Sequence, residues 1–128
     1  MTATMVKLVY VIHRRDDVSP EAFYAYWKDR HGPLVRSFAQ AIRATRYVQS
    51  HTLATPLNDA LQASRGMLAP EAGITEVWWK SLDDLQAGFA SEDGQRAARA
   101  LIEDEAKFID LASSRCFLTE EHTIFEDP

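Results

Sequence analysis

The sequence predicts a single α+β domain over residues 1–128, in which helices pack against one sheet. Runs rich in β-branched and aromatic residues alternate with amphipathic runs in the order strand, helix, strand, strand, helix, strand. The length suits one domain with a sizeable core, and 46% hydrophobic with 26% charged residues is an ordinary globular composition. This order is the split βαβ pattern of the ferredoxin-like sandwich.

The first strand is predicted over residues 5–13, which read Met-Val-Lys-Leu-Val-Tyr-Val-Ile-His. The run is β-branched and aromatic, is too short for a solitary helix, and is followed by a charged turn. Because side chains alternate along a strand, Leu8, Tyr10 and Ile12 share one face. Both faces are largely apolar, so we expect the strand to be covered on both sides.

A helix is predicted to begin at Ser19-Pro20-Glu21, which combines a capping hydroxyl, a proline suited to the first turn and an acid near the positive helix end. We expect it to run to about Arg30, with Trp27 on its buried stripe. Gly32-Pro33 is expected to break the helix, and a further apolar set predicts that it resumes.

The middle of the chain predicts two strands joined by a long connection. Residues 46–53 alternate in polarity and favour a second strand, and residues 74–80 favour a third. Between them, residues 54–73 are rich in small and turn-forming residues, with one short helix expected around 59–64. A connection this long is typical of a lid or a binding loop.

The C-terminal part predicts two helices and a last strand. Residues 81–84 carry a capping pattern that opens a helix, and a long helix follows residues 91–94. Residues 115–125 are expected to form the fourth strand. One face of the resulting sheet carries no helix, and an uncovered apolar face is most simply buried against a second copy, so we expect a homodimer.

Charge and composition exclude several classes of partner. Fourteen Lys and Arg against nineteen Asp and Glu give a formal charge of -5 without a basic run, which disfavours nucleic acid and anionic membranes. No window approaches the roughly 18 apolar residues of a membrane span. The single Cys116 cannot form an internal disulfide, and the first residues lack a signal-peptide core, so a cytoplasmic location is expected.

Metal and cofactor motifs are not found in the sequence. The four histidines, at positions 13, 31, 51 and 122, have no ligand spacing such as His-Glu-x-x-His, so no metal site is predicted. There is no glycine-rich phosphate loop, and no cofactor is expected. Cys116 lies in an apolar strand and no nucleophile elbow exists, so nucleophilic catalysis is not predicted.

Several segments together resemble the EthD family over nearly the whole chain, residues 54–73 excepted. The residues that carry the resemblance are the strand 7–15, Ser19-Pro20-Glu21-Ala22-Phe23, Tyr26-Trp27, His31-Gly32-Pro33-Leu34, Glu76-Val77-Trp78-Trp79, Ser81-Leu82-Asp83-Asp84-Leu85, Asp104-Glu105 with Phe108, and Thr119-Glu120-Glu121-His122. The run Phe-x-x-Tyr-Trp…His-Gly-Pro is the most specific combination.

The resemblance implies a dimeric α/β barrel in which two sheets pack face to face and each protomer keeps a pocket between its sheet and its helices. It also implies that Tyr10 points into the barrel. Relatives of the family include methylmuconolactone isomerases and polyketide cyclases or decarboxylases. Some of those cyclases carry a histidine where this chain has Ser91-Glu92-Asp93-Gly94, so that catalytic residue does not transfer. Related barrels also bind haem, usually through a histidine from a helix. Haem binding is the less favoured alternative for this chain, and His31 would be its candidate ligand.

Three residues are candidates for catalysis. His31 ends a helix and can titrate near neutral pH, although it can also be a structural cap that binds a backbone carbonyl. Tyr10 can orient or protonate a carbonyl oxygen, or can be a core tyrosine. Glu105 lies on the apolar stripe of the long helix, so burial would make it a general acid or base unless it pairs with Lys7, with Arg115 or with an arginine of the first helix.

Four further residues are candidates for binding a ligand. Trp27 and Trp79 offer flat surfaces for a planar molecule, although tryptophans are more often simply core. Trp78 and Trp79 are adjacent in a strand, so only one of them faces the pocket. Tyr47 and His51 share a strand face with a glutamine, which makes that face either solvent-exposed or the polar wall of a pocket.

Two kinds of function therefore follow from the sequence. In the first, the protein is a cofactor-independent acid–base enzyme of the isomerase, cyclase, dehydratase or decarboxylase type, acting on a small apolar carbonyl or lactone compound. In the second, it binds a small hydrophobic or aromatic molecule without chemistry of its own, as an accessory protein of an oxidative pathway. A family-level oxidoreductase label would fit that accessory role. A purely structural dimer with a filled core is a third alternative.

Overall fold

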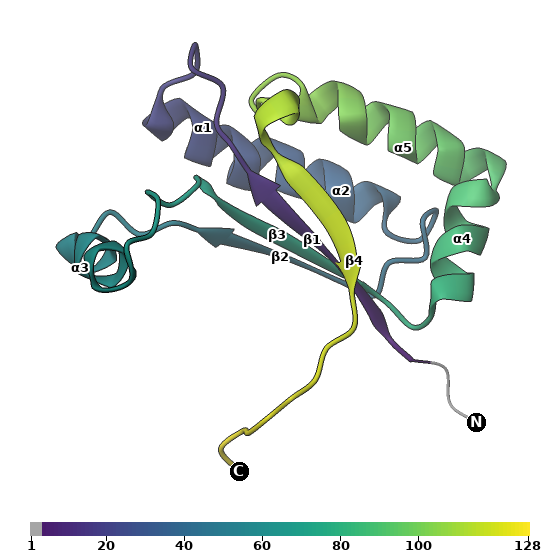
Figure 1. Ribbon diagram of the computed structural model, residues 1–128. Coiled ribbons are helices and arrows are strands. Elements are labelled where there is room, and N and C mark those ends of the chain that lie inside the picture. Colours follow the sequence, from purple (N-terminus) through teal and green to yellow (C-terminus); the bar gives the residue numbers. More distant parts are fainter. Residues whose placement is uncertain (1–3) are drawn as a thin grey trace.

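A computed structural model describes residues 4–128, which form four strands and five α-helices (Figure 1). The strands are β1 (Val6–Ile12), β2 (Arg46–His51), β3 (Gly73–Trp79) and β4 (Arg115–Thr119). The α-helices are α1 (Pro20–Tyr26), α2 (Gly32–Phe38), α3 (Pro56–Arg65), α4 (Leu82–Ala90) and α5 (Glu92–Glu105), with a π-helical turn at Trp27–His31 and a 3₁₀ turn at Leu111–Ser113.

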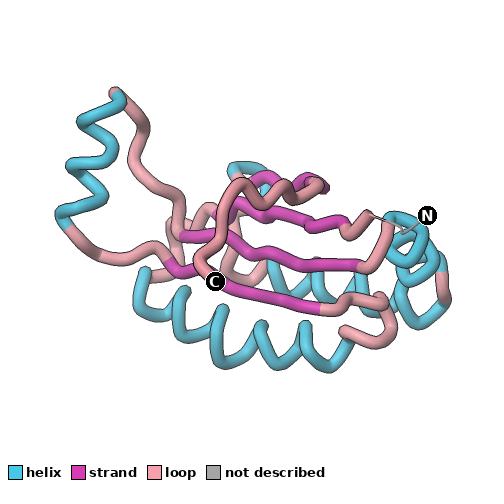
Figure 2. Tube along the Cα trace, turned by 90° about the horizontal axis from the view of Figure 1, so that it is seen from below, coloured by secondary structure: helices cyan, strands magenta, loops and turns pink. Residues whose placement is uncertain are grey.

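The four strands make one antiparallel sheet in the order β2-β3-β1-β4. Helices α1, α2, α4 and α5 lie along one face of this sheet, and the other face carries none of the described helices (Figure 1; Figure 2 shows the sheet from below). This is the predicted ferredoxin-like sandwich, and the prediction is confirmed. Ile12 is buried in the core beneath the helices, so Leu8 and Tyr10, which alternate with it, face the helices too.

The predicted break at residues 32–33 is wrong, because the helix continues through a π-helical turn. The Gly32 amide donates to the carbonyl of Trp27, five residues back, and α2 starts at once with Pro33 in its first turn. Proline has no amide proton to lose at that position, and the wider π turn accommodates its ring. The extra residue in this turn changes which side chains point at the sheet, and His31 is its last residue.

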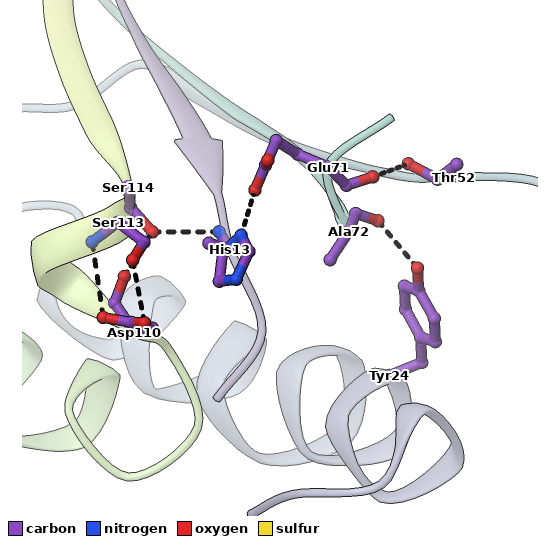
Figure 3. A network of polar contacts seen from close by, with 8 residues as sticks. All are labelled: His13, Tyr24, Thr52, Glu71, Ala72, Asp110, Ser113 and Ser114. Carbon is purple, nitrogen blue, oxygen red and sulfur yellow. Dashed lines mark hydrogen bonds and ion pairs between the residues drawn. The ribbon is translucent and has the colours of Figure 1, made fainter. Parts of the chain in front are cut away.

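The connection between β2 and β3 contains α3, which stands away from the rest of the protein (Figures 1 and 2). The segment after α3 is tied back by three side chains (Figure 3). His13 Nδ1 lies 2.7 Å from a Glu71 oxygen, Thr52 donates to the Glu71 carbonyl, and Tyr24 donates to the Ala72 carbonyl. His13 therefore anchors this connection rather than contributing to the core.

Strand β4 ends at Thr119, six residues before the predicted end at Phe125. The cause is the length of its neighbour: Thr119 pairs with Lys7, and β1 begins one residue earlier at Val6. Residues 120–128 have no strand beside them and extend away on the side of the sheet without helices (Figure 1). Glu121 is held to that open face by the Trp78 indole and by Lys7, 3.6 Å away.

The core between sheet and helices consists of two apolar clusters. One gathers Ile12, Phe23, Trp27, Phe108 and Ile109 under α1 and the end of α5. The other gathers Ile42, Val77, Trp79 and Ala97 under α4 and the start of α5. None of the helices formed by residues 4–128 is long and apolar enough to cross a membrane.

Candidate functional site

A cavity of about 360 Å³ lies between the two core clusters, enclosed by the helix-covered face of the sheet and by α2, α4, α5 and the π-helical turn. Most of its lining side chains are aliphatic or aromatic. The polar exceptions are Tyr10, His31, Tyr47, Thr75 and Glu105, with the thiol of Cys116. A largely apolar cavity with a few convergent polar groups is the usual form of a small-molecule site.

Glu105 and Tyr10 form one hydrogen-bonded pair in this cavity. Tyr10 comes from β1, Glu105 from the last turn of α5, and the Tyr10 hydroxyl donates to Glu105 Oε1 over 3.0 Å. Burial raises the pKa of Glu105 to about 7, although the Tyr10 hydrogen bond opposes the rise. The same burial and the nearby carboxyl raise the pKa of Tyr10 above its usual range, so it stays a phenol. Glu105 therefore exchanges a proton near neutrality, while Tyr10 serves as a donor.

His31 is 4% exposed at the end of the π-helical turn, and its Nδ1 lies 2.7 Å from Asp104 Oδ2. Burial lowers the pKa of His31, an effect that Asp104 opposes only in part, so the ring is neutral at pH 7. Since the Asp104 carboxylate accepts the Nδ1 proton, the lone pair is on Nε2, which makes no hydrogen bond within residues 4–128. This arrangement presents His31 as a neutral base with a fixed tautomer.

Asp104 is the centre of a separate polar group, which we call the Asp104 cluster and which consists of Asp104, Tyr26, His31 and Lys107. The Tyr26 hydroxyl donates to Asp104 Oδ1, and the Lys107 ammonium lies 3.4 Å from that oxygen. Burial alone would raise the pKa of Asp104, but the hydrogen bonds of Tyr26 and His31 lower it. Asp104 is therefore ionised, and it positions His31 rather than facing the cavity.

Two of the three tryptophans line the cavity. Trp27 is fully buried and packs its ring on Gly73, where a Cβ would lie 2.9 Å from the indole. Trp79 donates its indole proton to the Ile42 carbonyl over 2.7 Å and faces the helices, as the register of β3 requires. Trp78 points to the open face, where Arg46 lies over its ring. The question which of the two adjacent tryptophans faces the cavity is thus answered in favour of Trp79.

Tyr47 and His51 share the inner face of β2 but end in different places. Tyr47 lines both the cavity and an open groove of about 840 Å³ between β2 and α2, whereas His51 lines the groove and not the cavity. The Trp27 ring lies between His51 and the cavity, because His51 stacks on it at 4.3 Å between ring centres. Burial and then Lys28 lower the pKa of His51. His51 therefore reaches the cavity only through other side chains.

The structure thus brings six of the seven predicted site residues to the cavity wall: His31, Tyr10, Glu105, Trp27, Tyr47 and Trp79. Tyr10 points toward the helices, into the cavity between the sheet and its helices. None of the ion pairs considered for Glu105 forms within residues 4–128. Lys7 faces the opposite side of the sheet and binds Glu76 at 2.7 Å, and Arg115, which pairs with Val11, lies on that side too. His31 binds a carboxylate rather than the backbone carbonyl expected of a cap.

Sequence reasoning missed Asp104 as a functional residue. The signal was present, because Asp104 continues the stripe of Ala97 and Leu101 toward Phe108 at helical spacing. A buried aspartate on such a stripe needs polar partners. Within residues 4–128, no three His, Cys, Asp or Glu side chains gather in a way that could hold a metal ion.

Comparison with protein families matches residues 15–112 to the EthD domain, which is most of the chain. A comparison with curated proteins found no match. The first of the similar solved structures is an EthD family protein from Bacillus halodurans, with a TM-score of 0.62 and 19% identity over 92% of this chain and 99% of that one.

Two other solved structures have the same fold and a similarly low sequence identity to this chain. One is a dimeric protein of ferredoxin-like fold from Bacteroides fragilis, with a TM-score of 0.58 and 15% identity over 94% of this chain and 100% of that one. The other is SnoaB, a cofactor-independent oxygenase from Streptomyces nogalater, with a TM-score of 0.55 and 16% identity over 97% of this chain and 100% of that one. These likenesses establish the fold.

Proposed function

Because the chain belongs to the EthD family, we propose that it binds a small apolar carbonyl or lactone compound and moves protons on it without a cofactor. The observation that carries this proposal is Glu105, a carboxyl group in an apolar cavity whose pKa of about 7 lies near neutral pH. A general acid or base is most effective when its pKa is near the ambient pH.

Glu105 has the first role in the proposed reaction. Its carboxylate removes a proton from the carbon next to the carbonyl, and the electron pair of that C–H bond moves onto the carbonyl oxygen. Tyr10 donates to Glu105 while the carboxyl is ionised. Once Glu105 carries the proton it no longer needs that donor, so the Tyr10 hydroxyl can turn to the oxygen of the substrate.

His31 has the second role. Its free Nε2 can take a proton from, or return one to, a second position of the substrate, while Asp104 keeps the tautomer and stabilises the imidazolium formed in passing. A proton removed at one carbon and returned at another is an isomerisation. Loss of a hydroxyl group from the β carbon of the same enolate gives the dehydratase alternative. In the decarboxylase alternative, a β-keto acid loses CO₂, the electron pair of the broken C–C bond forms the enolate directly, and a protonated residue then returns a proton to its carbon.

The surrounding side chains support chemistry that excludes water. Trp27, Trp79 and the aliphatic lining give the cavity a low polarity, in which a proton transfer to Glu105 is not diverted to solvent. SnoaB, which shares the fold, is described as a cofactor-independent oxygenase. That description supports cofactor-free chemistry in this fold, although it belongs to a protein only 16% identical.

Deuterium exchange tests the proposal without knowledge of the natural substrate. A panel of small cyclic ketones and lactones is incubated with the protein in D₂O, and loss of the proton signals beside the carbonyl is followed by NMR. We expect exchange with at least one compound, and a loss of about 100-fold or more in Glu105→Gln. Glu103→Gln, an exposed acid on the same helix, is the matched control and keeps the rate.

A binding protein without chemistry is the second candidate, and the predominance of apolar side chains in the cavity favours it. In that case ligands would bind and be recovered unchanged. Native mass spectrometry of the freshly purified protein would show any retained compound. Exchange that is absent from every compound, together with tight binding of one of them, would replace the enzyme proposal by this accessory role in an oxidative pathway.

We also propose that two chains pack through the sheet face without helices, as a homodimer. That face carries Val9 and Val11 of β1 and the half-exposed Phe117 of β4, and the Bacteroides fragilis protein of the same fold is described as dimeric. The same native mass spectrum reads the assembly. A stable monomer at micromolar concentration would contradict the dimer, and with it the barrel.

A further inference from the structure

Three polar side chains on one face of β2 form a ladder that connects the outer groove to the cavity. Tyr47, Gln49 and His51 alternate along the strand and therefore point the same way. His51 Nε2 lies 2.8 Å from Gln49 Oε1, and Gln49 Nε2 donates to the Tyr47 oxygen over 2.8 Å. The ladder ends at the Tyr47 hydroxyl, in the cavity.

The direction of each hydrogen bond in this ladder is fixed by one acceptor. Gln49 Nε2 lies 2.8 Å from the Trp27 carbonyl, which can only accept, so the amide must present its NH₂ group there. The second proton of that group goes to the Tyr47 oxygen, and Gln49 Oε1 is left to accept from His51. Tyr47 is therefore an acceptor toward Gln49, and its own proton is free for another partner.

Two donors at the cavity wall consequently have no well-formed hydrogen bond among residues 4–128. The Tyr47 hydroxyl donates none, and Trp27 Nε1 is fully buried without a partner of good geometry. Both residues line the cavity, and they lie close together: burial raises the pKa of Tyr47, and hydrogen-bonding contacts of Gln49, Thr75 and Trp27 with its hydroxyl oppose the rise. Buried polar groups without partners are rare in native proteins, and each calls for a physical reason such as a role in catalysis or in holding a bound molecule.

We propose that the Tyr47 hydroxyl and the Trp27 indole N–H together bind a negatively charged or strongly polarised oxygen of the ligand, such as a phenolate or an enolate. Gln49 and His51 are positioning residues that hold Tyr47 with its proton directed into the cavity. The proposal rests on the proposed function, because it names where the oxygen of the carbonyl substrate lies. It defines the ligand class as a carbonyl compound that forms an enolate, or a phenol that resembles one.

With this subsite, one residue of the cavity removes the proton and others stabilise the charge that forms on oxygen. Glu105 takes the proton from carbon, and the charge that appears on oxygen meets two donors that are already in place. Tyr10 is not available for that oxygen at the start, since it donates to Glu105. The transfer also leaves Glu105 uncharged, so the anionic oxygen shares the cavity with a neutral carboxyl group.

Binding of 4-nitrophenol tests the subsite, because its absorption separates the phenol from the phenolate. The titration uses buffer acidic enough that the free probe is mostly neutral and Glu105 is mostly protonated. We expect the wild-type protein to bind the probe and to increase its ionised fraction. Tyr47→Phe should weaken binding about tenfold or more, since a hydrogen bond to a charged group is lost, and should lower the ionised fraction of bound probe.

Three further variants separate the subsite from general effects on the fold. Tyr24→Phe removes a hydroxyl outside the cavity and should bind the probe as the wild type does. Replacement of Trp27 by benzothienylalanine keeps the ring shape and removes only the N–H, and should lower the ionised fraction as Tyr47→Phe does. His51→Phe keeps an aromatic ring over Trp27 but frees Gln49, so it should shift the bound spectrum in the same direction by a smaller amount.

The results decide between the two proposals. Failure of the wild type to bind the probe, or an unchanged bound spectrum in Tyr47→Phe, would overturn the oxygen subsite whatever the exchange assay shows. Probe binding that depends on Tyr47, combined with no deuterium exchange in the wild type, would leave the subsite standing and overturn the enzyme proposal.

Discussion

Asp104 and Glu105 are neighbours in sequence, yet the structure holds their carboxyl groups in opposite states. Both belong to the last turns of α5, and both are at least partly buried. Asp104 receives hydrogen bonds from Tyr26 and His31 and lies near the Lys107 ammonium, so its pKa is lowered. Glu105 receives one hydrogen bond, from Tyr10, and burial raises its pKa to about 7.

The difference shows that the number and charge of the donors decide the protonation state, and burial alone does not. The Asp104 cluster offers an ionised carboxylate two donors and a nearby cation, enough to offset its loss of hydration. Glu105 has a single neutral donor, which offsets only part of that loss. One carboxylate is thereby committed to structure and to positioning His31, while its neighbour remains free to exchange a proton with a ligand.

The largest expected effect is a loss of stability when Asp104, the structural residue of the two, is replaced. Asp104→Ala leaves the buried Nδ1 of His31 and the partly buried Tyr26 hydroxyl without their acceptor. We expect the free energy of unfolding at neutral pH to fall by roughly 2–4 kcal/mol, as is typical when one partner of a buried polar network is removed. Urea denaturation followed by tryptophan fluorescence measures the change.

Glu103→Ala is the control for that experiment, because Glu103 is exposed on the same helix. It should change stability by less than about 0.5 kcal/mol. If Asp104→Ala costs no more than this control, the Asp104 cluster does not stabilise the fold, and its contrast with Glu105 is lost.

A smaller effect of the opposite sign is expected for Glu105→Gln. The pKa of Glu105 is about 7 in the folded protein and near 4.5 ordinarily, so between these values the folded state binds more protons than the unfolded state. Wild-type stability therefore decreases as pH rises from about 4.5 to about 7. The glutamine variant lacks this loss and should exceed the wild type by roughly 1–3 kcal/mol near pH 8.

Denaturation curves at several pH values check this prediction. The gap between Glu105→Gln and wild type should narrow as pH falls from about 7 and should close below about 4.5, where the carboxyl becomes protonated in both states. A gap that is independent of pH would mean that Glu105 ionises as an ordinary surface carboxyl group. Glu103→Gln, measured in parallel, should show no such dependence.

Helical periodicity in the sequence predicted that Glu105 is buried but did not lead to the same prediction for Asp104. Helical spacing placed Glu105 on the apolar stripe of α5, which is where the structure has it. The same spacing places Asp104 on that stripe, but a polar residue between apolar ones was not interpreted as buried. Alternation along β1 also puts Lys7 opposite to Tyr10, so the cation considered as a partner for Glu105 could have been excluded from the sequence.

The partners themselves were beyond the reach of the sequence. Tyr10 and Glu105 are 95 positions apart, and their contact depends on how α5 crosses the sheet. His31 meets Asp104 because the π-helical turn adds one residue to the helix, and the sequence Gly32-Pro33 suggested a break there. The position of His51 outside the cavity likewise depends on the Trp27 ring, which packs against Gly73 and closes the cavity at that side.

The smallest effect concerns the one donor that Glu105 has. The Tyr10 hydrogen bond stabilises the carboxylate, so Tyr10→Phe should raise the pKa of Glu105 further, by about one unit, which corresponds to about 1.4 kcal/mol. NMR titration of protein labelled with ¹³C at the glutamate carboxyl groups would follow this residue, with Tyr24→Phe as control. An unchanged pKa would mean that solvent replaces Tyr10 at no cost, and that the cavity is wetter than its lining indicates. A higher pKa would show that a single neutral donor separates Glu105 from full neutrality, just as two donors and a nearby cation keep Asp104 ionised beside it.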